Sequence, residues 1–137
     1  MTTKEYLGQA YKFYKFITLK KAELESYKEL SVSVSSCGFE EKLNSSRNIN
    51  APFAKYTEKI IDLEKEISCD IEKLEDLKYE IGLKINEIQN INERLILIYR
   101  HLMFMNWGEI AEKMSYSKRW VYKIYDRAVE NFSGIIK

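Results

Sequence analysis

An apolar residue recurs at every seventh position over a long stretch of this chain, and this repeat constrains the fold more than any other feature. Counted from Ile60, each step to Leu102 carries an isoleucine or a leucine. The residues are Ile60, Ile67, Leu74, Ile81, Ile88, Leu95 and Leu102. A repeat of this length predicts a long amphipathic helix whose apolar seam packs against another helix.

A second set of positions in the same seam indicates whether the partner helix belongs to the same chain. Three residues after each member of the repeat most side chains are apolar, but Asp70 and Lys84 are charged, and an isoleucine follows each of them. Charged side chains would be costly in the tight seam of a parallel dimer. The widened apolar face favours a partner within the same chain. We therefore expect Thr3 to Leu30 to fold back antiparallel on about Phe53 to Gln89.

The segment between these two helices has a different composition. Residues 31–52 are rich in serine and asparagine, whose side chains compete with helical hydrogen bonds. This stretch is predicted to form a flexible loop, and Pro52 suits the first turn of the next helix. The expected first domain is thus a helical hairpin, or coiled-coil stalk, over residues 1–89.

The remaining residues, 90–137, are predicted to form a three-helix domain, so the whole chain is expected to be all-α. Asn90 and Glu93 have the spacing of a helix cap, which predicts a break near 89–91 and a helix from about Ile91 to Phe104. Asn106 and Ser117 are expected to cap two further helices. Two helices joined by three or four residues form a helix-turn-helix.

The apolar spacing predicts which side of each of these helices faces the core. The expected inward residues of the first helix are Leu95, Ile98, Tyr99 and Leu102. Those of the second are Trp107, Ile110, Ala111 and Met114, and those of the third are Val121, Ile124, Ala128 and Phe132. His101 is expected to be partly exposed, and Tyr125, Asp126 and Glu130 are expected to face solvent.

The opposite face of the third helix carries the expected function. Its outward residues near the amino end are Lys118, Arg119, Tyr122 and Lys123. A helix amino end attracts phosphate, and Arg and Lys can also contact guanine edges in the major groove. Tyrosine can reach a phosphate or a thymine methyl group. These four residues and Ser117 are therefore the candidate DNA-binding residues, with double-stranded DNA as the partner of a helix over about 118–131.

The distribution of charge agrees with this assignment. Between Phe53 and Glu93 there are six lysines against eleven aspartates and glutamates. Between Arg94 and Lys137 there are eight basic residues against four acidic ones. An acidic middle and a basic end suggest that the end alone meets a polyanion.

Part of the sequence also resembles a known family. The segment ERLILIYRHL followed by WGEIAEKMSYSKRWVYKIYDRAV is similar to region four of sigma factors, and more similar to phage late-gene regulators of the RinA and ArpU type. The matching positions are Trp107, Glu109, Ile110, Ala111, Tyr116, Ser117, Arg127, Ala128 and Val129. Upstream, Ser45-Ser46 and KIIDLEKEI, from Lys59 to Ile67, resemble the same family more loosely.

This resemblance implies binding to promoter DNA and control of phage or prophage transcription. One departure concerns the turn, where Ser115 stands in place of the family's glycine. If Ser115 adopts a positive φ, the serine costs some stability relative to glycine. Two alternatives remain open: a DNA-recognition subunit like the phage small terminase, and a coiled-coil adaptor that acts on RNA polymerase without touching DNA. RNA polymerase and a second copy of the chain are further candidate partners, and the role of Trp120 is left open.

Other function classes are not expected. The sequence has no glycine-rich phosphate loop and no nucleophile paired with a histidine in a known pattern, so no enzyme is predicted. Cys37, Cys69 and His101 lie too far apart in sequence to suggest a metal site, and no cofactor is expected. Lysines interrupt every early apolar stretch, so neither a signal peptide nor a membrane partner is expected, and the protein is predicted to be cytoplasmic.

Overall fold

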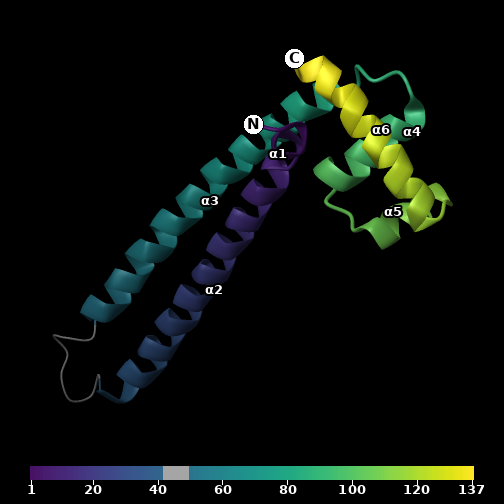
Figure 1. Cartoon of the computed structure of the whole chain (residues 1–137). Helices are drawn as coiled ribbons and strands as arrows, with labels where there is room; N and C mark the ends of the chain where they lie inside the picture. The colour runs from purple at the N-terminus through teal and green to yellow at the C-terminus, as the bar shows by residue number, and fades with distance from the viewer. Residues whose placement is uncertain (42–49) are drawn as a thin grey trace. The chain divides into compact units, whose positions relative to one another are not determined.

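The protein is all-α. A computed structural model describes the backbone of residues 1–41 and 50–137, and the side chains of residues 1–32 and 54–137. The helices in this part of the chain are α1 (Thr3–Leu7), α2 (Gln9–Glu41), α3 (Asn50–Ile85), α4 (Ile91–Leu97), the π-helical turn η1 (Ile98–Leu102), α5 (Trp107–Met114) and α6 (Lys118–Ile136) (Figure 1). Among these residues, no helix combines the length and apolar character needed to cross a membrane.

The helices group into two compact units. The terminal unit contains Met1–Tyr14 and Lys73–Lys137, and the hairpin unit contains Lys15–Glu72. This division differs from the predicted boundary between residues 89 and 90. The first residues of the chain, Met1–Tyr14, and the end of α3 from Lys73 onward belong to the same compact unit as α4, α5 and α6, and α1 contacts α6.

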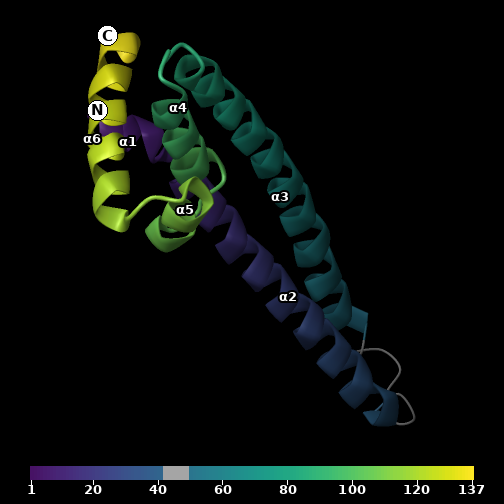
Figure 2. The ribbon, with the colours of Figure 1, turned by 90° about the vertical axis from the view of Figure 1, so that its right-hand side faces the viewer.

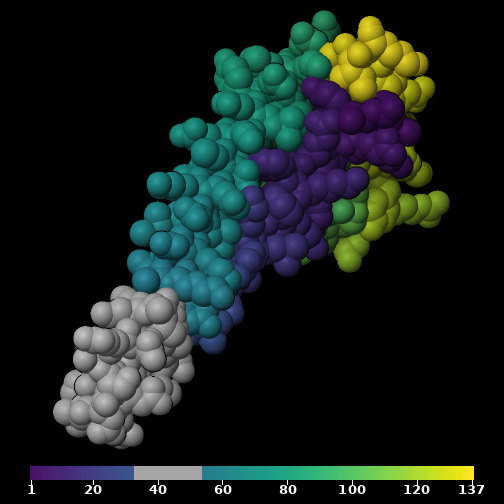
Figure 3. Space-filling model, turned by 90° about the vertical axis from the view of Figure 1, so that its left-hand side faces the viewer, coloured from purple at the N-terminus to yellow at the C-terminus, as the bar shows by residue number. Residues whose placement is uncertain are grey.

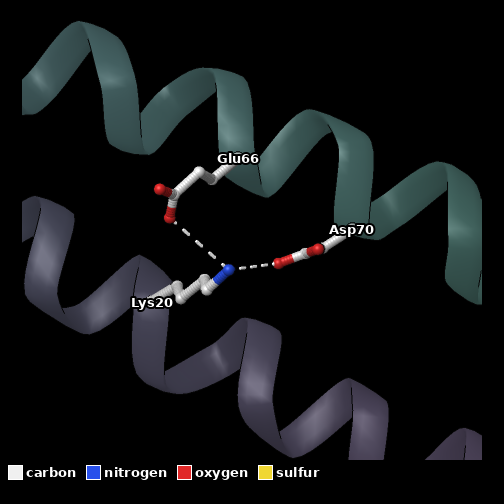
Figure 4. Close-up of polar contacts among 3 residues, drawn as sticks. All are labelled: Lys20, Glu66 and Asp70. Atoms are coloured by element: carbon white, nitrogen blue, oxygen red, sulfur yellow. Dashed lines mark hydrogen bonds and ion pairs between the residues drawn. The ribbon is translucent and has the colours of Figure 1, made fainter.

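In the hairpin unit, α2 and α3 run antiparallel. Lys20 of α2 forms ion pairs with Asp70 (2.5 Å) and Glu66 (3.5 Å) of α3, as Figure 4 shows. Lys28, further along α2, lies 3.7 Å from Glu64, which is earlier in α3. This arrangement is compatible with the predicted hairpin, and it explains why a charged residue, Asp70, can occupy the seam: a lysine of the facing helix neutralises it.

The loop predicted at about 31–52 is wrong at both ends. Helix α2 continues to Glu41 and α3 already begins at Asn50, while residues 42–49 lie outside the described part of the chain. Serine and asparagine each cost a helix only a few tenths of a kcal/mol relative to good helix formers. Their abundance therefore weakens a helix without ending it. The first helix also differs from the prediction, because Gly8 separates α1 from α2.

The start of the chain belongs to the core of the terminal unit. Leu7 is fully buried, and the ring of Tyr6 lies 5.9 Å from that of Phe132 in α6. Lys84 of α3 donates a hydrogen bond to the Tyr6 hydroxyl at 2.8 Å, so the second charged seam residue meets α1. Figure 2 shows α1 beside α6, and Figure 3 shows the first residues against the last ones.

The core of the terminal unit confirms the predicted inward face of α6. Val121, Ile124, Ala128 and Phe132 are all buried. In α5, Ile110 and Ala111 are buried as expected, whereas Trp107 and Met114 are only partly covered. Asp126 and Glu130 are exposed, as predicted.

The inward face predicted for the helix before them is wrong. Leu95, Ile98, Tyr99 and Leu102 are partly exposed, and the residues that are buried instead are Glu93, Ile96, Leu97 and His101. Two physical causes act together. The helix breaks after Ile85, so the heptad does not continue in phase. The chain then forms a π-helical turn, with the Met103 N–H bonded to the Ile98 carbonyl at 2.9 Å, and this extra residue bears only on the end of the helix, where His101 is buried in place of Leu102.

Candidate nucleic-acid interface

Helix α5 begins as the sequence indicates. Asn106 accepts a hydrogen bond from the Glu109 N–H through its side-chain oxygen at 2.9 Å, and its amide donates to the Glu109 carboxylate at 2.7 Å. The start of α5 is thus held by a cap whose two side chains also bond each other. Asn90 caps α4 in the same way, but Glu93 bonds the Asn131 amide at 2.7 Å instead of returning to its cap.

The turn after α5 has a left-handed residue at its first position. Ser115 has φ 59° and ψ 37°. Its N–H bonds the Glu112 carbonyl at 3.2 Å, and the next N–H, of Tyr116, bonds the Ala111 carbonyl at 3.1 Å. These two bonds form a Schellman motif, in which glycine usually occupies the left-handed position. The positive φ that the missing glycine suggested is therefore present.

Ser117 ends the turn and starts α6. Its hydroxyl oxygen accepts a hydrogen bond from the Trp120 N–H at 3.2 Å, so the serine is an N-cap. The next residues of α6 leave their side chains outside the core. The exposed set includes all four outward residues predicted from the sequence: Lys118, Arg119, Tyr122 and Lys123. The structure thus brings the candidate residues together on the first two turns of one helix.

An aromatic cluster holds Tyr122 in place. The Trp107 ring lies 5.1 Å from the Tyr122 ring and 4.8 Å from the Tyr125 ring, both in edge-to-face geometry. The Arg100 guanidinium covers the Trp107 ring at 4.6 Å, and it also donates a hydrogen bond to the Met105 carbonyl at 3.0 Å. Tyr122 keeps 45% of its surface exposed. Its ring is therefore oriented by packing while remaining available to a ligand.

Below this cluster lies a polar pair that the sequence did not indicate. His101 and Tyr125 were expected at the surface, but both are buried, and a His101 ring nitrogen lies 2.9 Å from the Tyr125 hydroxyl. Burial, together with the positive charge of Arg100, lowers the pKa of His101 to about 4. Burial also raises the pKa of Tyr125. Both groups are therefore neutral near pH 7, and they anchor α6 to η1 by a hydrogen bond.

The other side of α6 carries residues that sequence analysis did not assign. Trp120 is 41% exposed, and the Arg127 guanidinium lies over its ring at 6.0 Å. These residues border a recess of about 200 Å³ between α6 and the start of α4, which Asn92 and Tyr116 also line. The seven-residue spacing of Trp120 and Arg127 on one helix is the sequence signal that could have found this pair.

The basic residues of α6 are not neutralised within the structure. In the described part of the chain, Lys118, Arg119, Lys123 and Arg127 form no ion pair. These four cations are exposed, and the positive end of the α6 dipole adds to their charge near Lys118 and Arg119.

Comparisons with protein-family models, curated proteins and solved structures find no match to this chain.

Proposed function

We propose that the protein is a sequence-specific DNA-binding transcription regulator, of phage or prophage origin, that contacts promoter DNA with α6. The observation that carries the proposal is the first two turns of α6. There, a Schellman turn and a serine cap precede an exposed cluster of three cations and a packed tyrosine. The resemblance to RinA- and ArpU-type regulators, noted from the sequence, supports the phage origin and the role in transcription.

The arrangement suits the major groove for a geometric reason. A helix about 10–12 Å across fits a groove about 12 Å wide, and residues at its amino end are the ones that contact base edges. Arg119 and Lys123 are four residues apart and occupy the middle of the exposed face. Arg119 can form paired hydrogen bonds with guanine, while Lys123 provides a point charge for phosphate or base.

Affinity measured against salt concentration, on promoter and random duplexes, tests this function. Arg119→Ala should cost about 1–3 kcal/mol of specific binding if the arginine contacts a base edge. Lys123→Ala should weaken binding to all duplexes alike and reduce the salt slope by about 0.9 if the lysine contacts a phosphate.

Two further variants separate lost contacts from lost structure. Ile124→Asp should abolish binding by placing a charge in the core, and circular dichroism should report unfolding. The quadruple alanine variant at Lys118, Arg119, Tyr122 and Lys123 should stay helical and lose DNA. If that variant binds its promoter as tightly as the wild type, α6 does not contact the DNA, and the adaptor alternative becomes the better explanation.

A further inference from the structure

A helix that lies in the major groove has a phosphate backbone on both sides, because the groove is scarcely wider than the helix. On one side of α6, residues of α5 are close by. Tyr122 packs on Trp107, and the end of the Lys118 side chain lies 3.7 Å from the position that a side-chain carbon on Gly108 would occupy. On the other side, α6 carries Trp120 and Arg127, two turns apart on one face.

The recess on this second side has the chemistry of an anion site. Arg127 contributes a cation that makes no ion pair in the described part of the chain. Trp120, Tyr116 and Asn92 line the same recess and bring an indole N–H, a phenol and an amide, which are all hydrogen-bond donors. Each of these four side chains is exposed to solvent, so a ligand can reach them without a change in the fold.

One acidic residue also lines the recess, and the structure accounts for it. Glu93 is only 6% exposed, and its carboxylate accepts a hydrogen bond from Asn131 at 2.7 Å. Its charge is therefore partly satisfied within the protein and little accessible from the recess. The accessible groups are cationic or neutral donors, which is what a DNA phosphate requires.

We propose that this recess binds a backbone phosphate of the DNA strand opposite the one that faces α5. The proposal rests on the proposed function, since it takes α6 as the helix in the groove. Trp120 and Arg127 then fix the position of the helix between the two strands and carry no sequence preference. A base-contacting residue such as Arg119 would determine which DNA sequence is preferred. Trp120 and Arg127 would instead determine how deeply and at what angle α6 lies in the groove.

The salt dependence of binding to a random-sequence duplex tests this proposal. Arg127→Ala should reduce the slope of log affinity against log salt by about 0.9, the value for one lost phosphate contact. It should weaken promoter and random duplexes by the same factor. Arg127→Lys, which keeps the charge, should retain the wild-type slope. Lys137→Ala is the matched control, because it removes one exposed cation at the far end of α6 and should leave the slope unchanged.

Tryptophan emission supplies a second measurement. Trp107 and Trp120 are the two tryptophans of the chain, so the change in emission when DNA is added to the wild type has contributions from both. The same titration of Trp120→Phe shows how much of that change comes from the recess. We expect a smaller change in emission from this variant than from the wild type, and an equally large change would mean that DNA does not reach the recess. If Arg127→Ala keeps the wild-type slope while Arg119→Ala loses specific binding, the recess is not a phosphate site and the proposed function stands. If the wild type binds no duplex at low salt, both are overturned.

Discussion

The hairpin unit and the terminal unit bury their apolar residues to different degrees. In the hairpin unit the seam is narrow: Ile17, Leu63 and Ile67 each keep between 3% and 8% of their surface exposed, and Phe16 and Leu19 lie largely in solvent. In the terminal unit, residues such as Ile96 and Phe132 are completely buried. Two antiparallel helices can cover only one face of each other, whereas several crossing helices enclose a core from more than one side.

This difference teaches where periodicity is a reliable guide. In a two-helix seam, the residue that faces the partner is set by the helical repeat alone, and the heptad identifies it. In the terminal unit, the residue that faces the core also depends on where helices break, and on which neighbours cross them. There the predicted inward set before α5 is wrong, although the helices themselves are present.

The largest expected effect comes from emptying the enclosed core. Phe132→Ala should destabilise the terminal unit by about 3–5 kcal/mol, because its ring is fully buried and its neighbours cannot close the cavity. Ile67→Ala, in the open seam of the hairpin unit, should cost about 2 kcal/mol, at the low end of the range for such truncations.

Two optical probes can separate these effects. Both tryptophans belong to the terminal unit, so tryptophan emission follows that unit, whereas circular dichroism follows helices in both. Phe132→Ala should lower the midpoint temperature of the unfolding transition seen by fluorescence more than Ile67→Ala does. Equal shifts in both transitions for both variants would mean that the two units unfold as one, and the comparison between them would lose its basis.

A second effect arises in the terminal unit alone and depends on pH. The pKa of His101 is about 4 in the fold, against 6.5 for an ordinary histidine, because burial disfavours the charged ring. Between these values the unfolded chain binds more protons than the folded one. The contribution of the neutral His101 to the free energy of unfolding is therefore fully present above about pH 6.5. It should fall by up to about 3 kcal/mol as the pH drops to 4.

Urea unfolding followed by tryptophan emission at several pH values measures this loss. His101→Gln is the matched variant, because glutamine does not titrate and can still bond the Tyr125 hydroxyl. The variant is expected to be less stable near neutral pH but to lose less stability on acidification. If the free energy of unfolding of the variant falls as steeply with decreasing pH as that of the wild type, other groups cause the acid sensitivity.

A smaller effect is expected from the charged pair in the hairpin seam. Its hydrogen bond to Asp70 raises the pKa of Lys20, so the pair contributes stability below the ordinary lysine pKa of 10.5 and loses it as the pH rises further. Lys20→Met should lower the melting temperature by leaving Asp70 unpaired in a partly buried position. The double variant Lys20→Met, Asp70→Leu should recover the loss, because an apolar pair fits the same seam. If the double variant melts no higher than the single one, the pair does more than neutralise a charge.

The parts of the molecule that could be predicted are those determined by neighbours in sequence. The caps at Asn90, Asn106 and Ser117 and the buried face of α6 follow from local patterns, and each is present. The π-helical turn could not be predicted, because no residue pattern in η1 indicates an extra residue in the turn. The burial of His101 depends on that turn and on Tyr125, which lies 24 residues away.

Part of the candidate site could likewise be predicted from local sequence patterns, and part could not. The exposed cations of α6 could be found from the helical repeat, because solvent is the default environment of the polar face. The packing of Tyr122 on Trp107, and the recess beside Trp120, could not be found in this way. They depend on the angle at which α5 and α4 approach α6, and a helical wheel contains no such information.

The smallest effect concerns two residues with the same unusual backbone. Ser115 and Phe104 both have φ 59°, a left-handed conformation that disfavours any residue with a Cβ atom. Ser115→Gly removes this strain in the folded state but gives the unfolded chain more freedom. Since the serine is exposed and its side chain is not needed for the turn, we expect a net gain of at most about 1 kcal/mol.

Phe104→Gly is the matched variant, and it should have the opposite sign. The Phe104 ring stacks on Tyr14 at 4.8 Å and lies under the Lys78 ammonium at 4.9 Å, so glycine would relieve the same strain but remove these contacts. An aromatic ring deleted from a packed position costs more than the strain in one residue. Melting temperatures of the two variants measure both effects. A rise for Ser115→Gly and a fall for Phe104→Gly would show that packing keeps one left-handed residue in place, while the hydrogen bonds of the turn suffice for the other. A fall for both would mean that the Ser115 side chain contributes more to the turn than its strain costs.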